Sequence, residues 1–141
     1  MYKRLFLILL CMQNLLPVFA VDWRATFPKR YVDFSSVSQI QDVNTFLYPN
    51  RYLFWEKRLN DNSMYFKRVE KLRGKKVWYA LSRLGVDCHK GMYALYEDIP
   101  YDLNNTVIMT NYKATEYTLE WQGVPPGTII DYYYKWLCAP Y

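Results

Sequence analysis

Histidine is almost missing from this chain, since His89 is the only one in 141 residues. A single histidine is a weak basis for a histidine-based catalytic triad or metal site. Cys88 precedes His89, but a Cys–His nucleophile also needs a third group that orients the imidazole. The sequence also lacks the phosphate-binding patterns GxxxxGK(S/T) and GxGxxG and the redox pattern CxxC. We therefore predict that the protein is not an enzyme and holds no metal and no cofactor.

Long apolar runs are confined to the first 20 residues. Lys3 and Arg4 precede an apolar stretch, and Val18 and Ala20 fit the −3 and −1 positions of a signal-peptidase site. The stretch is too short for a spanning helix, which needs about 20 apolar residues. We therefore predict that residues 1–20 are a cleaved signal peptide. The protein is then secreted to the extracellular space, with no membrane partner.

Cysteine is scarce as well, with three in the chain. Cys11 lies in the predicted signal peptide, which leaves Cys88 and Cys138 in an oxidising compartment. We predict a disulfide between these two. It would close a loop of about 50 residues, worth about 4 kcal/mol in the loop-entropy account. Since one disulfide cannot hold a domain by itself, apolar side chains must form most of the core of residues 21–141.

Aromatic residues, by contrast, make up 19% of the chain. A disordered chain has few aromatics, so the composition indicates a folded domain. The formal net charge of +5 is mild, and Lys3 and Arg4 contribute two of these charges; we predict no nucleic-acid partner. The densest basic stretch is residues 67–76, which is suited to an acidic partner or a heparin-like glycan. The interpretation that we favour from sequence is a solvated hairpin whose charges protect strand edges.

The spacing of apolar residues predicts one short helix and then a series of strands. Apolar residues at positions 37, 40, 43, 46 and 47 follow two serines, which indicates a helix within residues 35–47. Residues 22–36 are interpreted as an irregular arm. Strand patterns separated by Gly, Pro, Asn and Asp recur about every ten residues, which favours an antiparallel barrel or sandwich. The expected strands are residues 51–59, 63–72, 75–84, 91–97, 106–112, 114–122 and 128–137. We predict an all-β fold: an antiparallel β-barrel with a short N-terminal helix.

Several strands carry aromatic residues on both faces. These rings are suited either to a solid core or to a ligand cavity, and the residues alone leave both alternatives open. Asn104, Asn105 and Thr106 form an N-glycosylation sequon in an expected loop, so we predict a glycan on Asn104.

Four short segments resemble the tick salivary lipocalins, which are relatives of histamine-binding proteins. Residues 41–47 lead into the aromatic segment 52–55, as at the start of those chains. Residues 85–88 and 133–138 are similar in layout to later parts of the family. The resemblance implies a lipocalin-like β-barrel over residues 21–141 that binds a small host mediator, such as histamine, serotonin or a lipid.

If that cavity exists, residue type and strand position suggest which side chains line it. The candidates are Trp55, Tyr79, Glu97, Tyr117 and Trp121. The leading hypothesis is a secreted, monomeric protein that sequesters a biogenic amine or a lipid. The rival hypothesis is a secreted interaction protein with a filled core. It would bind a host protein or glycan through exposed tyrosines and the stretch 67–76.

Overall fold

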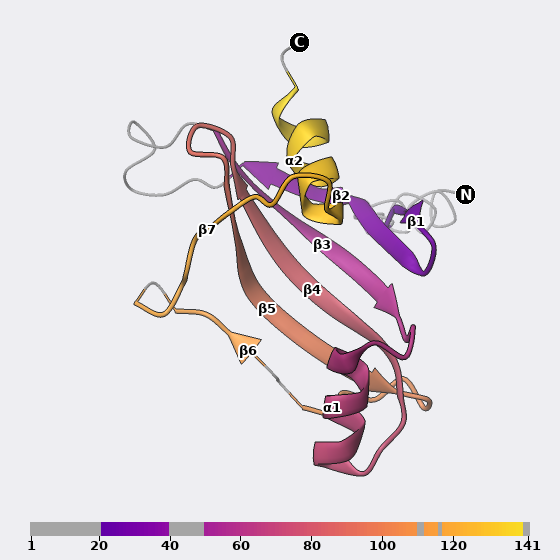
Figure 1. Ribbon diagram of the computed structural model, residues 1–141. Coiled ribbons are helices and arrows are strands. Elements are labelled where there is room, and N and C mark those ends of the chain that lie inside the picture. Colours follow the sequence, from indigo (N-terminus) through magenta and orange to yellow (C-terminus); the bar gives the residue numbers. More distant parts are fainter. Residues whose placement is uncertain (1–20, 40–49, 110–111, 116, 140–141) are drawn as a thin grey trace, which may run out of the picture.

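The computed structural model describes residues 21–39, 50–109, 112–115 and 117–139, and these form one antiparallel sheet with two helices (Figure 1). The strands are β1 (Trp23–Phe27), β2 (Arg30–Gln39), β3 (Arg51–Leu59), β4 (Val77–Asp87), β5 (Met92–Asp102), β6 (Tyr112–Lys113) and β7 (Gln122–Gly123). The helices are α1 (Met64–Arg73) and α2 (Ile129–Cys138).

The seven strands lie in the order β1-β2-β3-β4-β5-β6, and β7 also pairs with β5. Over the described residues β1 and β6 stay at opposite ends of this order, so the sheet does not close. The predicted β-dominated antiparallel fold is confirmed at that level, whereas the barrel finds no support. The predicted strand 51–59 coincides with β3. The segment 22–36, expected to be irregular, is instead a hairpin in which Lys29 has a φ of 62°.

The predicted strand 63–72 is wrong, because this segment forms α1. Phe66 and Val69 lie three residues apart and are both buried against the sheet, which is the period of a helix. Gly74 ends α1 with a φ of 65°, and its N–H donates to the carbonyl of Glu70. A left-handed residue at this position is a common helix ending.

The predicted strand 128–137 is also wrong, because it forms α2. Its isoleucines and tyrosines favour strands, but that preference yields to packing on one helical face. Thr128 caps the helix, since its side-chain oxygen accepts a hydrogen bond from the N–H of Asp131. Tyr133 is the large side chain of α2 that is fully buried against the sheet.

Three further predictions concern the expected helix, the signal peptide and a second hairpin. Of the expected helix within 35–47, residues up to 39 belong to β2, and residues 40–49 lie outside the described part. The signal peptide 1–20 lies outside it too. The expected hairpin between residues 106–112 and 114–122 is wrong, since the short strands β6 and β7 pair with β5 and not with each other.

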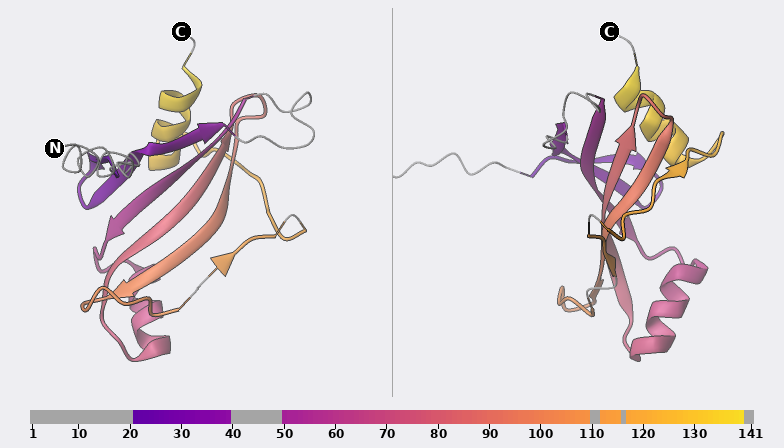
Figure 2. Two further views of the ribbon diagram at one scale, coloured as in Figure 1. Left: turned by 180° about the vertical axis from the view of Figure 1, so that it is seen from behind. Right: turned by 90° about the vertical axis from the view of Figure 1, so that its left-hand side faces the viewer.

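Both helices lie on the same face of the sheet, at opposite ends of it (Figure 2). Under α2 a hydrophobic cluster forms around Val32, Phe54, Val86 and Tyr133. Under α1 a second cluster forms around Phe66, Val69, Val77 and Ala80. Neither described helix lies on the other face.

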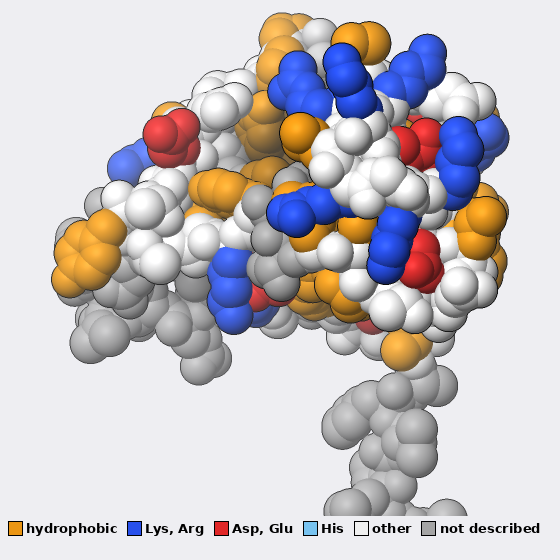
Figure 3. All heavy atoms as spheres, turned by 90° about the horizontal axis from the view of Figure 1, so that it is seen from below, with side chains coloured by type: hydrophobic (Ala, Val, Ile, Leu, Met, Phe, Trp, Pro, Cys, Tyr) orange, Lys and Arg blue, Asp and Glu red, His pale blue; other side chains and the backbone are white. Residues whose placement is uncertain are grey.

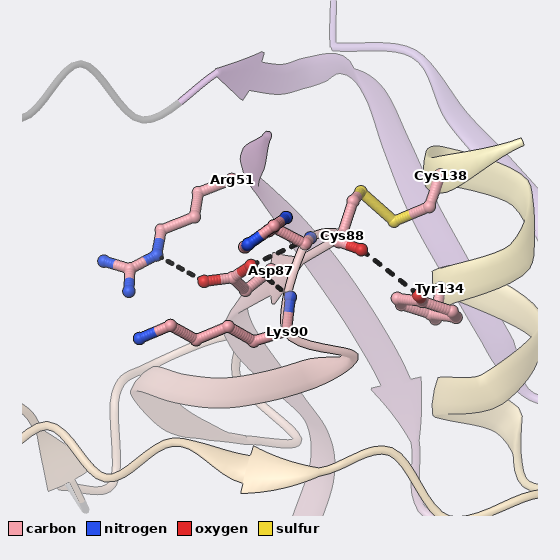
Figure 4. Close-up of a disulfide and its surroundings, with 7 residues drawn as sticks. Arg51, Asp87, Cys88, Lys90, Tyr134 and Cys138 are labelled. Carbon is pink, nitrogen blue, oxygen red and sulfur yellow. Dashed lines mark hydrogen bonds and ion pairs between the residues drawn. A yellow bond between two sulfur atoms is a disulfide. The ribbon is translucent and has the colours of Figure 1, made fainter. Parts of the chain in front are cut away.

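The predicted disulfide between Cys88 and Cys138 is present, with the two Cα atoms 5.4 Å apart (Figure 4). It joins the turn after β4 to the last residue of α2. Asp87 orders this turn, because its Oδ1 accepts hydrogen bonds from the N–H groups of His89 and Lys90. Its Oδ2 accepts a hydrogen bond from Arg51 at 2.8 Å. The disulfide and Asp87 together fix α2 to the end of the sheet.

Candidate functional site

Three of the ligand residues predicted from sequence lie on the helix-free face of the sheet. Trp55 and Glu97 stand in one row across the strands, with Arg83 between them. Tyr79 lies further along β4, and its ring stacks on Tyr101 with centroids 4.7 Å apart. The predicted ligand residues on this face are therefore spread along the sheet, and Tyr79 is only 7% exposed there.

The aromatic rings of this face already hold cations that belong to the chain. The Lys57 ammonium lies 4.4 Å from the centre of the Tyr79 ring, and the Arg83 guanidinium lies 5.9 Å from that of Trp55. Glu97 pairs with Lys113 at 3.6 Å. An amine ligand would have to displace these groups before it could use the rings.

The other two predicted residues are placed differently. Trp121 covers Gly85 together with Tyr96, whose ring would lie 2.5 Å from a Cβ atom added at Gly85. Arg51 lies 4.6 Å over the Trp121 ring. Tyr117 is 97% exposed and contributes to no enclosed site. Trp121 is therefore a covering residue of the sheet, and a small residue is required beneath it.

Acidic residues that the sequence did not single out are buried on the face that carries the helices. Glu56, Ser82 and Asp98 are direct neighbours across β3, β4 and β5, and each is 2% exposed. Arg30 donates to Glu56 at 2.9 Å, and Arg58 donates to Asp98 at 3.0 Å. We call these five residues the buried carboxylate network.

Each helix contributes a tyrosine to the buried carboxylate network. The Tyr133 hydroxyl of α2 donates to Glu56 at 2.5 Å, and the Tyr65 hydroxyl of α1 donates to Asp98. Burial raises the pKa of Tyr133, and the negative charge of Glu56 raises it further. The Arg58 guanidinium lies 4.6 Å over the Tyr65 ring. The network therefore links α1, the sheet and α2.

The chemistry of this network is structural. Both carboxylate oxygens of Glu56 accept hydrogen bonds, one from Arg30 and the other from Tyr133. Asp98 is engaged in the same way by Arg58, Ser82 and Tyr65. A general base needs a carboxylate oxygen that can reach a substrate proton, and here those oxygens are occupied. The prediction that the protein is not an enzyme stays a prediction.

A different feature marks the end of the sheet that carries α1. Its cations Lys67, Arg68, Lys71 and Lys75 are exposed and have no hydrogen-bond or ion-pair partner within the described part of the chain. We call these four residues the basic end. Every other described Lys or Arg has an interaction partner, and the partners include carboxylates, a carbonyl, a sulfur atom and aromatic rings.

Acidic groups near the basic end are already engaged. Glu70 accepts hydrogen bonds from the Val77 N–H and from Asn60, and it pairs with Lys76 at 3.3 Å. The Val77 N–H and Lys76 hold the pKa of Glu70 below its usual value despite some desolvation. Asp102 accepts hydrogen bonds from backbone N–H groups of its own turn. Neither carboxylate forms an ion pair with a residue of the basic end in the described part of the chain.

Large apolar side chains are exposed at the same end. Met64 is 73% exposed, Leu72 is 69% exposed and Leu103 is 65% exposed. We call these three residues the apolar trio. In Figure 3, which looks onto this end, Lys and Arg side chains are spread over the surface with hydrophobic side chains between them. Sequence reasoning found the cations but assigned them to a hairpin, and it did not find the trio.

A shallow hollow of about 280 Å³ lies beside the turn that follows α1. Lys75 and Lys76 line one part of it, and Asp102, Leu103 and Asn104 line another. Asn104, the predicted glycosylation site, is exposed in the turn after β5. Its glycosylation stays a prediction.

The described residues contain no group of three or more His, Cys, Asp or Glu side chains that could hold a metal ion. None of their helices has the length and hydrophobicity to cross a membrane.

Comparisons with known proteins identify the fold and no more. No protein-family model and no curated protein matches the sequence. Three crystal structures of Haemophilus influenzae protein E are similar, each at 14% sequence identity. The selenomethionine form has a TM-score of 0.59 over 85% of this chain and 88% of that chain. Crystal form II has a TM-score of 0.60 over 89% of this chain and 94% of that chain. The resemblance to tick salivary lipocalins stays a prediction.

Proposed function

We propose that this chain is a secreted interaction protein that binds an anionic partner through the basic end. The observation that carries the proposal is that the four cations of the basic end lack any partner among the described residues. The other lysines and arginines in the described part each have an interaction partner within the chain. Unpaired cations gathered on one surface attract anions and speed their association.

The spacing of these cations supports the proposal. Lys67 and Lys71 lie one helical turn apart on α1, about 6 Å between side-chain origins. Arg68 flanks them, and Lys75 follows in the turn after the helix. Such a row matches a ligand with repeated negative charges better than it matches a single small anion.

Sequestration of a small host mediator, which the lipocalin resemblance implies, is the alternative proposal. It has less support from the geometry, because the described sheet is open and its candidate rings Trp55 and Tyr79 already hold Arg83 and Lys57. Titration with histamine, serotonin and fatty acids, followed by tryptophan fluorescence, tests it. Saturable binding of one of them that is unaffected by charge changes at the basic end would favour this alternative.

Retention on heparin, used as a generic polyanion, tests the proposed function. The variant Lys67→Gln/Lys71→Gln should elute at clearly lower salt than the unchanged protein, because it loses two unpaired cations. The matched control Lys113→Gln/Lys135→Gln also removes two charges, but both of these lysines pair with carboxylates of the chain. Equal shifts for the two variants would show that only net charge matters and would overturn the proposal.

A further inference from the structure

We infer that the anionic partner of the basic end is the surface of an anionic lipid bilayer, an inference that rests on the proposed function. The observation behind it is that the apolar trio, Met64, Leu72 and Leu103, is exposed beside the cations. A surface that offers both cations and apolar side chains fits a bilayer interface. There the anionic headgroups meet the cations, and the acyl boundary accepts apolar groups.

The outer face of α1 combines the two kinds of side chain. Met64, Arg68 and Lys71 follow one another at intervals of four and three residues, so they share one face of the helix, and Leu72 borders it. The opposite face, with Phe66, is buried against the sheet. The helix is therefore anchored by one side and presents the other outward.

The shape of this end also favours a flat partner. The helix α1 lies at the far end of the sheet from α2 and projects beyond the strands in both views (Figures 1 and 2). Leu103, from the turn after β5, adds an apolar side chain beside Lys75 and Lys76. A projecting, convex end can rest on a plane.

The apolar trio separates a lipid surface from a sulfated glycan. A glycan would contact Lys67 and Lys71 through its sulfates and carboxylates and would leave Met64 and Leu72 in water. A bilayer would engage all four side chains. Such peripheral contact needs no spanning helix, so it agrees with the lack of one among the described residues. It replaces the expectation from sequence that no membrane is a partner.

Co-sedimentation with vesicles tests the inference. We expect the protein to bind vesicles of phosphatidylcholine mixed with phosphatidylglycerol and not vesicles of phosphatidylcholine alone. Leu72→Gln/Leu103→Gln should lower the partition coefficient about tenfold or more, because two exposed leucines no longer enter the interface. Lys67→Gln/Lys71→Gln should lower it about fivefold for each charge.

The control for the apolar change is Tyr117→Gln, which replaces a side chain that is 97% exposed and lies outside this end. It should leave vesicle binding unchanged. Circular dichroism of each variant excludes unfolding, which is not expected at exposed positions.

The outcomes separate this inference from the proposed function. If Leu72→Gln/Leu103→Gln loses vesicle binding but keeps its heparin retention, the lipid surface is supported. If mixed vesicles are not bound while heparin retention still depends on Lys67 and Lys71, the inference is overturned and a glycan or acidic protein is the partner. If neither vesicles nor heparin depend on these lysines, the proposed function fails too.

Discussion

The two ends of the sheet differ in whether their charged side chains are paired and their apolar side chains are buried. At the α2 end, Tyr133 is buried among apolar side chains, a disulfide fixes the helix, and Lys135 is paired with Asp131. At the α1 end, Lys67 and Leu72 are exposed, and Lys67 has no partner among the described residues. The α2 end therefore stabilises the fold, whereas the α1 end leaves interactions to be made with something else.

The largest loss of stability should come from the α2 end. Cys88→Ser/Cys138→Ser opens a loop of 50 residues and should lower the free energy of unfolding by about 4 kcal/mol. Urea unfolding of the variant and of the unchanged protein measures this difference. Those molecules of the variant that remain folded should keep their heparin retention, because the basic end lies at the other end of the sheet. A loss below about 1 kcal/mol would mean that packing around Tyr133 holds α2 without the disulfide.

A smaller loss should follow from Glu56→Gln, which leaves Arg30 and Arg58 close to a neutral amide. Breaking a buried ion pair costs about 3 kcal/mol, because the remaining charge is uncompensated. Glu70→Gln at the α1 end is the matched control, since Glu70 pairs with the exposed Lys76, and it should cost less. The difference between the two variants in the free energy of unfolding, measured in urea, compares the contributions of the two carboxylates to stability. Equal losses would contradict the comparison.

The stability of the α2 end should also depend on acid, through Asp87. Burial raises the pKa of Asp87, but hydrogen bonds from Arg51 and from the N–H groups of Lys90 and His89 outweigh it, so the pKa lies below the ordinary 3.8. A carboxyl with a lowered pKa stabilises the fold above its ordinary pKa, and this contribution is lost as the pH falls through the folded-state value. The unchanged protein should therefore exceed Asp87→Asn in stability at neutral pH, and the gap should close below about pH 4. A constant gap down to pH 2 would contradict this assignment.

The sequence predicts local pairing better than it predicts the helices. The β3 strand was found with its correct bounds, and the Cys88–Cys138 disulfide followed from an even cysteine pair after the predicted signal peptide is removed. These features depend on nearby residues or on simple counting. The open edge of the sheet was not predicted, because strand spacing is the same in a barrel and in an open sheet.

The sequence predicts strands where both helices lie, because residue preference there points to strands more strongly than periodicity points to helices. In α2 the segment from Ile129 to Leu137 is rich in residues that favour strands, yet Ile130, Tyr133 and Leu137, which pack in the cluster under the helix, recur at helical spacing. In α1 the spacing from Phe66 to Val69 carried the same signal. The buried carboxylate network was missed for another reason: Glu56 and Asp98 meet only through the register of β3, β4 and β5.

The smallest expected effect has the opposite sign and lies at the α1 end. The first turn of α1 has no acidic residue, and Lys67 faces Lys71 one turn later. Lys67→Glu should therefore raise the free energy of unfolding by about 0.5 kcal/mol, since it replaces the repulsion from Lys71 with an attraction and suits the helix dipole, while Glu70, three residues later, is already paired with Lys76. The same change should weaken heparin retention and vesicle binding. Lys67→Gln, which only removes the repulsion, should give a smaller gain in urea. A loss of stability in Lys67→Glu would instead show that Lys67 serves the fold, and the contrast between the two ends would then fail at this residue.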